Sequence, residues 1–409
     1  MVPTKSKYKV LHFCNKMPYP PKDGGAIGIN NVTKGLIDLE YDVRVLAINS
    51  TKHYIDTANL PTEYLNLTKF ESVEVDLDIK IFPALSNLIL SRRSYNISRF
   101  YNVKLLKKLK GLLNDDEFDI VILESIFLVD YLPIIRKKTK AKIILRAPNV
   151  EFIIWKRLSE IEANPFKKFY LKVLTSRLRR EEIRCLNKFD AIITVSDNDK
   201  KLLKTFGATV PIESIPTGID VEKDMNTTSV DVEYPSLFHL GALDWYPNQE
   251  AVSWILKNVW PELKNRLPNI KFYIAGRRPP EWINNIEEED VVVLGEVEDA
   301  AEFIKSKAIM PVPIFAGSGM RVKIIEAMML KKAVVSTSIG IEGIDHNDKE
   351  DILIANNPKD FIDSIEKLAT DKDYYNSVCE NAYINIMKKY GKDVLDDLLD
   401  KFIKEILKS

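Results

Sequence analysis

The chain has 409 residues, a length that accommodates two domains of ordinary size. Its 59 basic and 59 acidic residues cancel, which argues against nucleic-acid binding through overall charge. Cys14, Cys185 and Cys379 lie far apart and lack metal-ligand spacing, so we expect a cytosolic setting without a disulfide framework. We expect no signal peptide, and no apolar run approaches the roughly 20 residues that cross a bilayer.

Apolar runs alternate with helical segments through the first half, which predicts a parallel sheet covered by helices. Gly24 and Gly25 end a proline-rich turn, ahead of a helix predicted over residues 27–39. This turn follows the first strand, at the edge of the sheet where open α/β sheets bind ligands. The Gly-x-Gly-x-x-Gly fingerprint is absent, which weighs against a nicotinamide enzyme. The predicted strands are residues 8–13, 43–48, 119–123, 141–145 and 191–195.

Two tracts of the first half interleave basic residues with aromatic and aliphatic ones. The first covers residues 87–113, and the second covers residues 152–188 with a break near Asn164 and Pro165. Amphipathic segments of this composition can lie on anionic membranes. We therefore expect a peripheral contact with an anionic membrane, with solvated helix faces as the alternative.

The second half repeats the alternation after a polar stretch, residues 223–234, that is typical of a linker. Arg277 and Arg278 belong to a cationic glycine turn after the second of its predicted strands. Residues 361–409 are predicted to be helical throughout. The predicted strands here are residues 237–240, 271–275, 291–294, 309–314 and 333–337.

A glycine turn, residues 316–319, separates a short strand from a helix predicted to begin at Met320. Arg321 and Lys323 fall in the first turn of that helix, where the helix dipole already disfavours cations. Glycine backbone, free helix N–H groups and two cations together make a phosphate site. Glu326 shares a face with Lys323 and could accept hydrogen bonds from ribose hydroxyls, which suggests a nucleoside diphosphate. The alternative is an ordinary surface pair of Lys323 and Glu326.

The segment GSGMRVKIIEAMMLKKAVVSTSIGIEGI resembles the donor-binding segment of the GT-B glycosyltransferases, in particular glycosyltransferase family 4, the retaining group 1 enzymes. Glu326 matches the second glutamate of the family's Glu-x7-Glu motif, which binds the donor ribose. Ser318 stands where the first glutamate is found. Pro148 stands where relatives often have a histidine before Asn-Val-Glu. The segment from Ile215 to Asp220 resembles the turn at the family's domain crossing.

The resemblance implies an α/β GT-B fold with two Rossmann-like domains facing across a cleft. It places the acceptor domain at residues 1–216, the nucleotide-sugar domain at 217–390, and at 391–409 a helix that packs back on the first domain. The enzyme would be a retaining glycosyltransferase acting on a glycan or lipid-linked acceptor in polysaccharide or glycoconjugate biosynthesis. Cysteine usage and the two basic tracts would place it in the cytoplasm, either free or at the inner face of the cytoplasmic membrane.

The implied site residues fall into two groups. Arg321, Lys323 and Glu326 would be catalytic, with a donor phosphate oxygen taking the acceptor proton. We expect no catalytic metal and no cofactor besides the nucleoside-diphosphate-sugar substrate. A nucleotide-sugar epimerase of the same fold and a catalytically silent nucleotide-binding subunit stay open as alternatives. The substrate-binding residues would be Gly24, Gly25, Asn149, Glu151, Arg277, Arg278, Gly317, Ser318 and Gly319.

Overall fold

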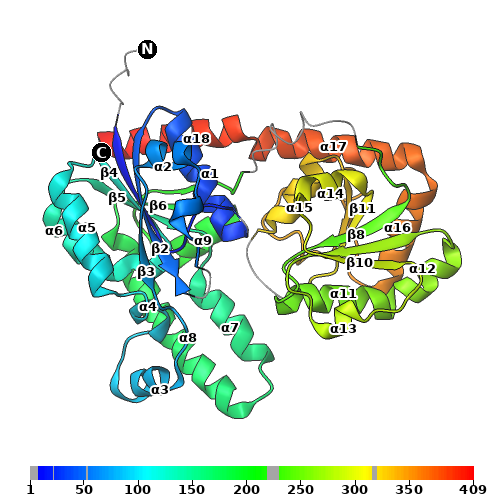
Figure 1. Cartoon of the computed structure of the whole chain (residues 1–409), viewed down its shortest axis with the longest axis horizontal. Coiled ribbons are helices and arrows are strands. Elements are labelled where there is room, and N and C mark those ends of the chain that lie inside the picture. Colours follow the sequence, from blue (N-terminus) through cyan, green and yellow to red (C-terminus); the bar gives the residue numbers. More distant parts are fainter. Residues whose placement is uncertain (1–7, 22, 52–53, 219–229, 316–319) are drawn as a thin grey trace. The chain divides into compact units, whose positions relative to one another are not determined.

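A computed structural model of the chain describes residues 8–21, 23–51, 54–218, 230–315 and 320–409 (Figure 1). The chain forms two compact units. Unit 1 contains the residues up to Gly218 together with Lys392–Ser409, and unit 2 contains Ile219–Gly391. No described helix is both long enough and apolar enough to cross a membrane.

Unit 1 is built on a parallel sheet of seven strands in the order β3-β2-β1-β4-β5-β6-β7. Its central strands are apolar on both sides, as expected of a parallel sheet covered on both faces. In β4, for example, every residue is buried. The strands are β1 Lys9–Cys14, β2 Asp42–Ser50, β3 Glu71–Val75, β4 Ile120–Glu124, β5 Lys142–Ala147, β6 Ala191–Thr194 and β7 Ile212–Ser214.

Alternate residues of these strands enter two different hydrophobic cores. The strand side chains on one face of the sheet, such as Val10 of β1, pack with α1 Gly24–Asp38 and with the C-terminal helix α18 Lys392–Lys408. These two helices lie together in Figure 1. The strand side chains on the opposite face, such as Leu11 of β1, pack against a second set of helices. Those helices include α4 Tyr95–Ser98, α5 Val103–Asp115, η3 Ile126–Tyr131, α6 Leu132–Lys138, α8 Pro165–Cys185 and α9 Asp197–Thr205.

The C-terminal helix is fixed to unit 1 by polar contacts as well as by its apolar face. Lys392 Nζ lies 2.7 Å from Asp38 Oδ2 at the end of α1. The Tyr41 hydroxyl donates a hydrogen bond to Asp400 Oδ1 at 2.8 Å. The expectation that this helix packs on the first domain is confirmed.

Of the remaining helices of unit 1, those over residues 152–188 follow the prediction. The tract 152–188 forms α7 Glu151–Ile161 and α8, with the break at Asn164, whose side chain caps α8. The tract 87–113 is divided among the end of α3 Ile81–Leu90, α4 and most of α5. Short helices are η2 Thr57–Asn59, α2 Thr62–Thr68 and η4 Leu186–Lys188.

Unit 2 contains a parallel sheet of six strands in the order β10-β9-β8-β11-β12-β13. The strands are β8 Ser236–Leu240, β9 Lys271–Ala275, β10 Val291–Gly295, β11 Ile309–Val312, β12 Ala333–Ser336 and β13 Leu353–Ile354. The helices are α11 Tyr246–Asn258, α12 Trp260–Arg266, α13 Glu281–Asn284, α14 Ala300–Ser306, α15 Val322–Met329, α16 Pro358–Thr370 and α17 Lys372–Tyr390.

Several predicted boundaries are wrong. Helix α1 begins at Gly24, because the Asp23 carboxylate accepts a hydrogen bond from the Ala26 N–H and caps it, so Gly24 and Gly25 are helical. Strand β11 ends before Pro313, which has no N–H for the ladder. Residues 361–409 are helical as predicted, and single residues, Asp371 and Gly391, divide them into α16, α17 and α18. Most of the expected linker lies outside the described residues.

Candidate functional site

In unit 2 the strand order reverses between β8 and β11, which is where open parallel sheets bind ligands. Helix α15 begins beyond the carboxyl end of β11. From its first turn, Lys323 Nζ donates a hydrogen bond of 2.6 Å to the Leu240 carbonyl at the end of β8. The side chain therefore joins the two sides of the reversal point. The alternative, in which Lys323 and Glu326 form an ordinary exposed surface pair, does not describe this lysine.

Burial dominates the electrostatics around Lys323. Desolvation lowers the pKa of Lys323 to about 8, with Arg277 acting in the same direction and Glu326 against it. Burial, reinforced by the charge of Lys323, lowers the pKa of His239 to about 3. The imidazole is therefore neutral at physiological pH. An anion placed here would raise the pKa of Lys323 by favouring its charged form.

Two buried nitrogens beside this lysine lack hydrogen-bond partners within the described part of the chain. They are His239 Nε2, on a residue that is 6% exposed, and Arg277 Nε. Buried polar groups in native proteins are almost always paired, so each such nitrogen calls for an explanation. A polar ligand bound at the end of β8 and β9 would supply the missing acceptors.

Two glycines bring the ends of β8 and β9 together. Gly276 has a φ of 155°, and a Cβ on it would stand 1.6 Å from the Gly241 carbonyl oxygen. The Gly241 N–H donates to the Ala275 carbonyl at 3.0 Å. This close approach fixes the chain at Arg277 and Arg278, and it leaves no room for a side chain at position 276.

The other predicted residues of unit 2 are placed as follows. Arg321 is the N-cap residue of α15, one position before its first turn, and Glu326 lies within the same helix. Arg278 has a φ of 52°, and its Nη1 lies 3.4 Å from Asp244 Oδ2. Gly317, Ser318 and Gly319 lie outside the described residues.

Unit 1 has a charged network at its own reversal point, between β1 and β4. His12 Nε2 lies 2.8 Å from Glu124 Oε1, and Arg146 Nη1 donates to Glu124 Oε2 at 2.9 Å. His12 Nδ1 lies 3.0 Å from the Thr33 hydroxyl, which donates its own hydrogen to the Ile29 carbonyl. Both ring nitrogens of His12 therefore face acceptors.

The network is closed to solvent, and its carboxyl group is held in the ionised form. His12, Glu124 and Arg146 are 0%, 1% and 2% exposed. Burial alone would raise the pKa of Glu124, but Arg146 and His12 outweigh it and the pKa is lowered. Arg146 Nη2 also lies 3.5 Å from the hydroxyl of Thr217, next to the last residue of this part of unit 1. These groups can position the strand ends, but they are too deeply buried to touch a substrate.

The candidate residues of unit 1 contact groups other than this network. Gly25 lies beside the Lys16–Asp23 ion pair, which spans 2.7 Å from Lys16 Nζ to Asp23 Oδ1. Asn149 is partly buried and hydrogen-bonds to Glu151. Glu151 is only 8% exposed, and burial raises its pKa to about 7.

Sequence reasoning missed the His12 network because its members are far apart in the chain. Glu124 is 112 residues from His12 and 22 from Arg146. The sequence did contain one indication of this network, which is a charged residue at the end of each of two apolar strands. Ser125, directly after β4, was missed as well. Its φ of 75° and ψ of 150° are strained for any residue but glycine, and such strain gathers at functional sites.

No metal site emerges from the described residues, which contain no group of three or more His, Cys, Asp or Glu side chains able to hold an ion. The sequence does contain Asp-x-Asp spacing, and each instance has a local contact. Asp76 pairs with Lys80, Asp199 accepts a hydrogen bond from the Ser196 hydroxyl, and Asp371 caps α17.

The two halves of the chain match two families. Residues 22–223 match Glycosyltransferase Family 4, and residues 234–371 match Glycosyl transferases group 1. The sequence is 24% identical over 408 residues to an uncharacterized 44.6 kDa protein in the cps region of Klebsiella pneumoniae, covering 93% of this chain and 96% of that protein.

Solved structures share the fold across the whole chain. Sucrose-phosphate synthase from Thermosynechococcus elongatus is similar with a TM-score of 0.70 and 11% identity, covering 97% of this chain and 99% of that one. HepE from Anabaena, in complex with UDP-glucose, is similar with a TM-score of 0.65 and 12% identity, covering 97% and 100%. The chain therefore belongs to the glycosyltransferases of the GT-B fold, with a Family 4 domain followed by a group 1 domain.

Proposed function

We propose that this glycosyltransferase moves a sugar, with retention of anomeric configuration, from a nucleoside-diphosphate sugar to a glycan or lipid-linked acceptor. The complex of HepE with UDP-glucose supports a nucleotide-sugar donor. The relative in the cps region supports a role in polysaccharide or glycoconjugate biosynthesis. The family matches do not favour a nucleotide-sugar epimerase.

The observation that carries the proposal is the position of Lys323. A cation whose pKa is lowered by burial lies at the reversal point of the sheet, next to two buried nitrogens with no acceptor among the described residues. A buried cation of this kind is stabilised by an anion, and a nucleoside diphosphate supplies both charge and acceptors.

The proposed chemistry is electrostatic. As the bond between sugar and diphosphate breaks, negative charge grows on the leaving phosphate oxygens. Lys323 and Arg321 are proposed to stabilise that charge, with Arg277 and Arg278 on the neighbouring strand end and the Gly317–Gly319 amides as further donors. A donor phosphate oxygen accepts the acceptor's proton, so the step needs neither a protein base nor a metal ion.

The remaining groups are proposed to bind rather than to react. Glu326 would accept hydrogen bonds from the donor ribose. On unit 1, Gly24, Gly25 and Asn149 would contact the acceptor. Glu151 reaches solvent with only 8% of its surface, so it would act mainly by holding Asn149.

A matched pair of lysine variants tests the proposal. Lys332, also in unit 2, is buried with a pKa of about 8, and its Nζ donates to the Lys305 carbonyl at 2.6 Å. Lys323→Met and Lys332→Met therefore remove equivalent buried cations. We expect Lys323→Met to lower turnover by on the order of 10²-fold or more. Lys332→Met should leave turnover nearly unchanged.

The assay follows release of nucleotide and sugar from UDP, GDP and TDP sugars in the presence of EDTA, with and without a glycan acceptor. Slow donor hydrolysis without acceptor identifies a transferase. A subunit that binds nucleotide but releases no sugar would be the silent partner instead. Equal losses in the two lysine variants would contradict the assignment of Lys323.

A further inference from the structure

Helix α3 presents an apolar face that the rest of unit 1 leaves uncovered. Phe82 is 83% exposed and Ile89 is 78% exposed, and with Leu85 they follow helical spacing along one face. The helix is nonetheless fixed in place. Arg177 of α8 donates to the carbonyls of Asn87 at 3.0 Å and Leu88 at 2.8 Å, which satisfies the last turn of α3. An exposed apolar face on an anchored helix marks an interaction surface.

The first turn of α8 carries a second exposed apolar cluster. Phe166 is 85% exposed and Phe169 is 64% exposed, one helical turn apart. Helices α3 and α8 are in contact, and Figure 1 shows α3 beside the α7–α8 hairpin at one end of unit 1. Lys167 lies between these phenylalanines in the sequence and Lys172 follows Phe169 by one helical turn, and both lysines are exposed. The apolar surface is therefore bordered by cations.

A cavity of about 740 Å³ lies between α4, the η3–α6 segment and the second half of α8. Its lining includes five cations and two carboxylates. Both carboxylates, Asp130 and Glu181, pair with the same cation, Arg93. The four other cations have no acidic partner within the described chain, and they are Arg92, Arg180, Arg184 and Lys188. The chain as a whole has no net charge, so this excess is local.

The apolar face and the cavity adjoin each other. Helix α3 ends at Leu90, which is 83% exposed, and Arg92 follows two residues later. Two residues span at most about 7 Å, so the last apolar side chain and the first cavity cation are neighbours. We propose that α3 and the first turn of α8 insert into the surface of an anionic membrane, and that the cavity binds the phosphate head group of an anionic lipid.

This combination favours a lipid over a soluble anion. A free phosphate would neutralise the cavity but would leave the phenylalanines of α3 and α8 in water. A membrane surface satisfies both, because it offers apolar chains beside a dense layer of phosphates. The inference deepens the proposed function, since a lipid-linked acceptor has to be met at a membrane surface.

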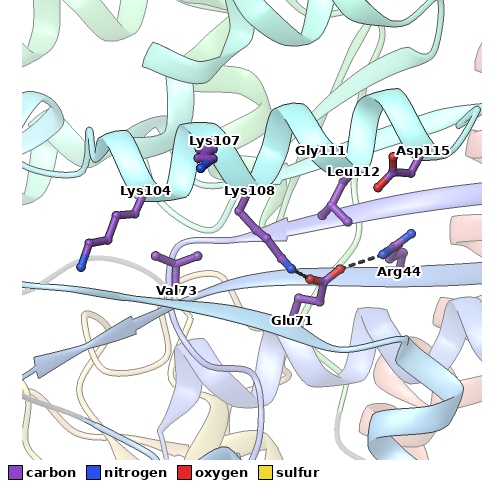
Figure 2. A pocket seen from close by; sticks show the side chains of 9 residues that line it. All are labelled: Arg44, Glu71, Val73, Lys104, Lys107, Lys108, Gly111, Leu112 and Asp115. Carbon is purple, nitrogen blue, oxygen red and sulfur yellow. Dashed lines mark hydrogen bonds and ion pairs between the residues drawn. The ribbon is translucent and has the colours of Figure 1, made fainter.

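The lysines of α5 belong to a different surface. Lys104 and Lys107 line a cavity of about 420 Å³ between α5 and strands β2 and β3 (Figure 2). Lys108 and Arg44 both contact Glu71 there, so carboxylates already offset part of the charge. This second cavity supplies a matched control, because two exposed lysines can be neutralised without touching the proposed lipid site.

The test measures partition of the full-length protein onto vesicles of phosphatidylglycerol and of phosphatidylcholine. We expect binding to phosphatidylglycerol that weakens with salt. Each cation near an anionic surface contributes about fivefold, so Arg180→Gln with Arg184→Gln should weaken the partition at least tenfold. Phe82→Ser with Ile89→Ser should also weaken it. The control, Lys104→Gln with Lys107→Gln, should change it much less than the double arginine variant.

Three outcomes would overturn the inference. The first is absence of binding to phosphatidylglycerol at low salt. The second is an equal loss of vesicle partition in the arginine and lysine double variants. The third is release of the wild-type protein from vesicles by inorganic pyrophosphate while the Phe82/Ile89 variant binds vesicles normally. The last result would identify a soluble-anion site. Titration of each variant with donor nucleotide separates this test from the proposed function. Intact donor binding with no vesicle binding would reject the membrane site alone.

Discussion

Lys323 lies in surroundings that disfavour a cation. The affinity of the protein for a nucleoside diphosphate should therefore depend on pH. The pKa of Lys323 is about 8 in the free protein and should rise when a diphosphate binds. Nucleotide affinity should therefore change little between pH 7 and about 8 and fall above it by up to tenfold per pH unit, because binding must then take up a proton. The phosphates themselves are fully ionised well below this range, with a pKa of about 6.

Calorimetric titration of the best-binding nucleotide between pH 7 and 9.5 measures this dependence. Lys323→Arg supplies the control, because a guanidinium stays charged throughout the range and should flatten the profile. A wild-type affinity that does not change with pH would show that Lys323 does not meet the phosphates.

Glu151 is a second residue whose burial has a measurable consequence. Its pKa is raised to about 7 by burial, whereas in the unfolded chain it lies near 4.5. Between these values the folded state holds the proton and the unfolded state does not. Stability should therefore fall as pH rises from about 4.5 to 7, by up to about 1.4 kcal/mol per pH unit. Glu151→Gln cannot ionise and should remove this loss.

Urea denaturation at pH 5, 6, 7 and 8 compares the two proteins. Glu182 has to be considered, because burial and then the charge of Glu151 raise its pKa to about 8. The glutamine variant should thus lower the pKa of Glu182 as well. Glu160→Gln, an exposed site on the same helix, is the control. Identical slopes for wild type and Glu151→Gln would contradict the buried, protonated carboxyl.

At the scale of elements, two helical glycines should respond in opposite ways to the same substitution. Gly111 in α5 has open space where a Cβ would stand, so Gly111→Ala should stabilise the protein by about 0.5–1 kcal/mol. A Cβ on Gly35 in α1 would stand 2.2 Å from Asp396 Oδ1 of α18. That carboxylate is held by Lys392 Nζ at 2.6 Å, so Gly35→Ala should destabilise α18 packing.

Thermal unfolding of the two alanine variants tests this prediction, because replacing glycine with alanine raises helical propensity equally at both sites. The melting temperature should rise in one variant and fall in the other. If Gly35→Ala stabilises the protein as much as Gly111→Ala does, the side chain of Asp396 moves aside at no cost and the close contact does not constrain the helix pair.

The strands were the elements most open to prediction from sequence. A parallel strand buried on both faces is a short apolar run with few alternatives, so β4 and β9 lie where the pattern places them. Helix starts were harder, because Asp23 caps α1 three residues before its apolar periodicity becomes clear. The cations of α15 were visible from their conflict with the helix dipole. The bond from Lys323 to Leu240 was not, since it depends on how β8 and β11 lie in the sheet.

At the scale of the whole molecule, the last helix belongs to the unit formed by the first residues. Leu399 on α18 is 2% exposed within the core shared with α1, whereas Val394 on the same helix is 44% exposed. Leu399→Asp places a charge in that core and should cost at least about 3 kcal/mol of unit 1 stability. Val394→Asp should have little effect.

Hydrogen exchange resolved along the chain locates the loss of stability. Faster exchange should appear in α1 and β2 while α11 and α16 keep wild-type protection, because the described residues of the core that α18 completes all belong to unit 1. Equal loosening of both units would show instead that they unfold as one cooperative body.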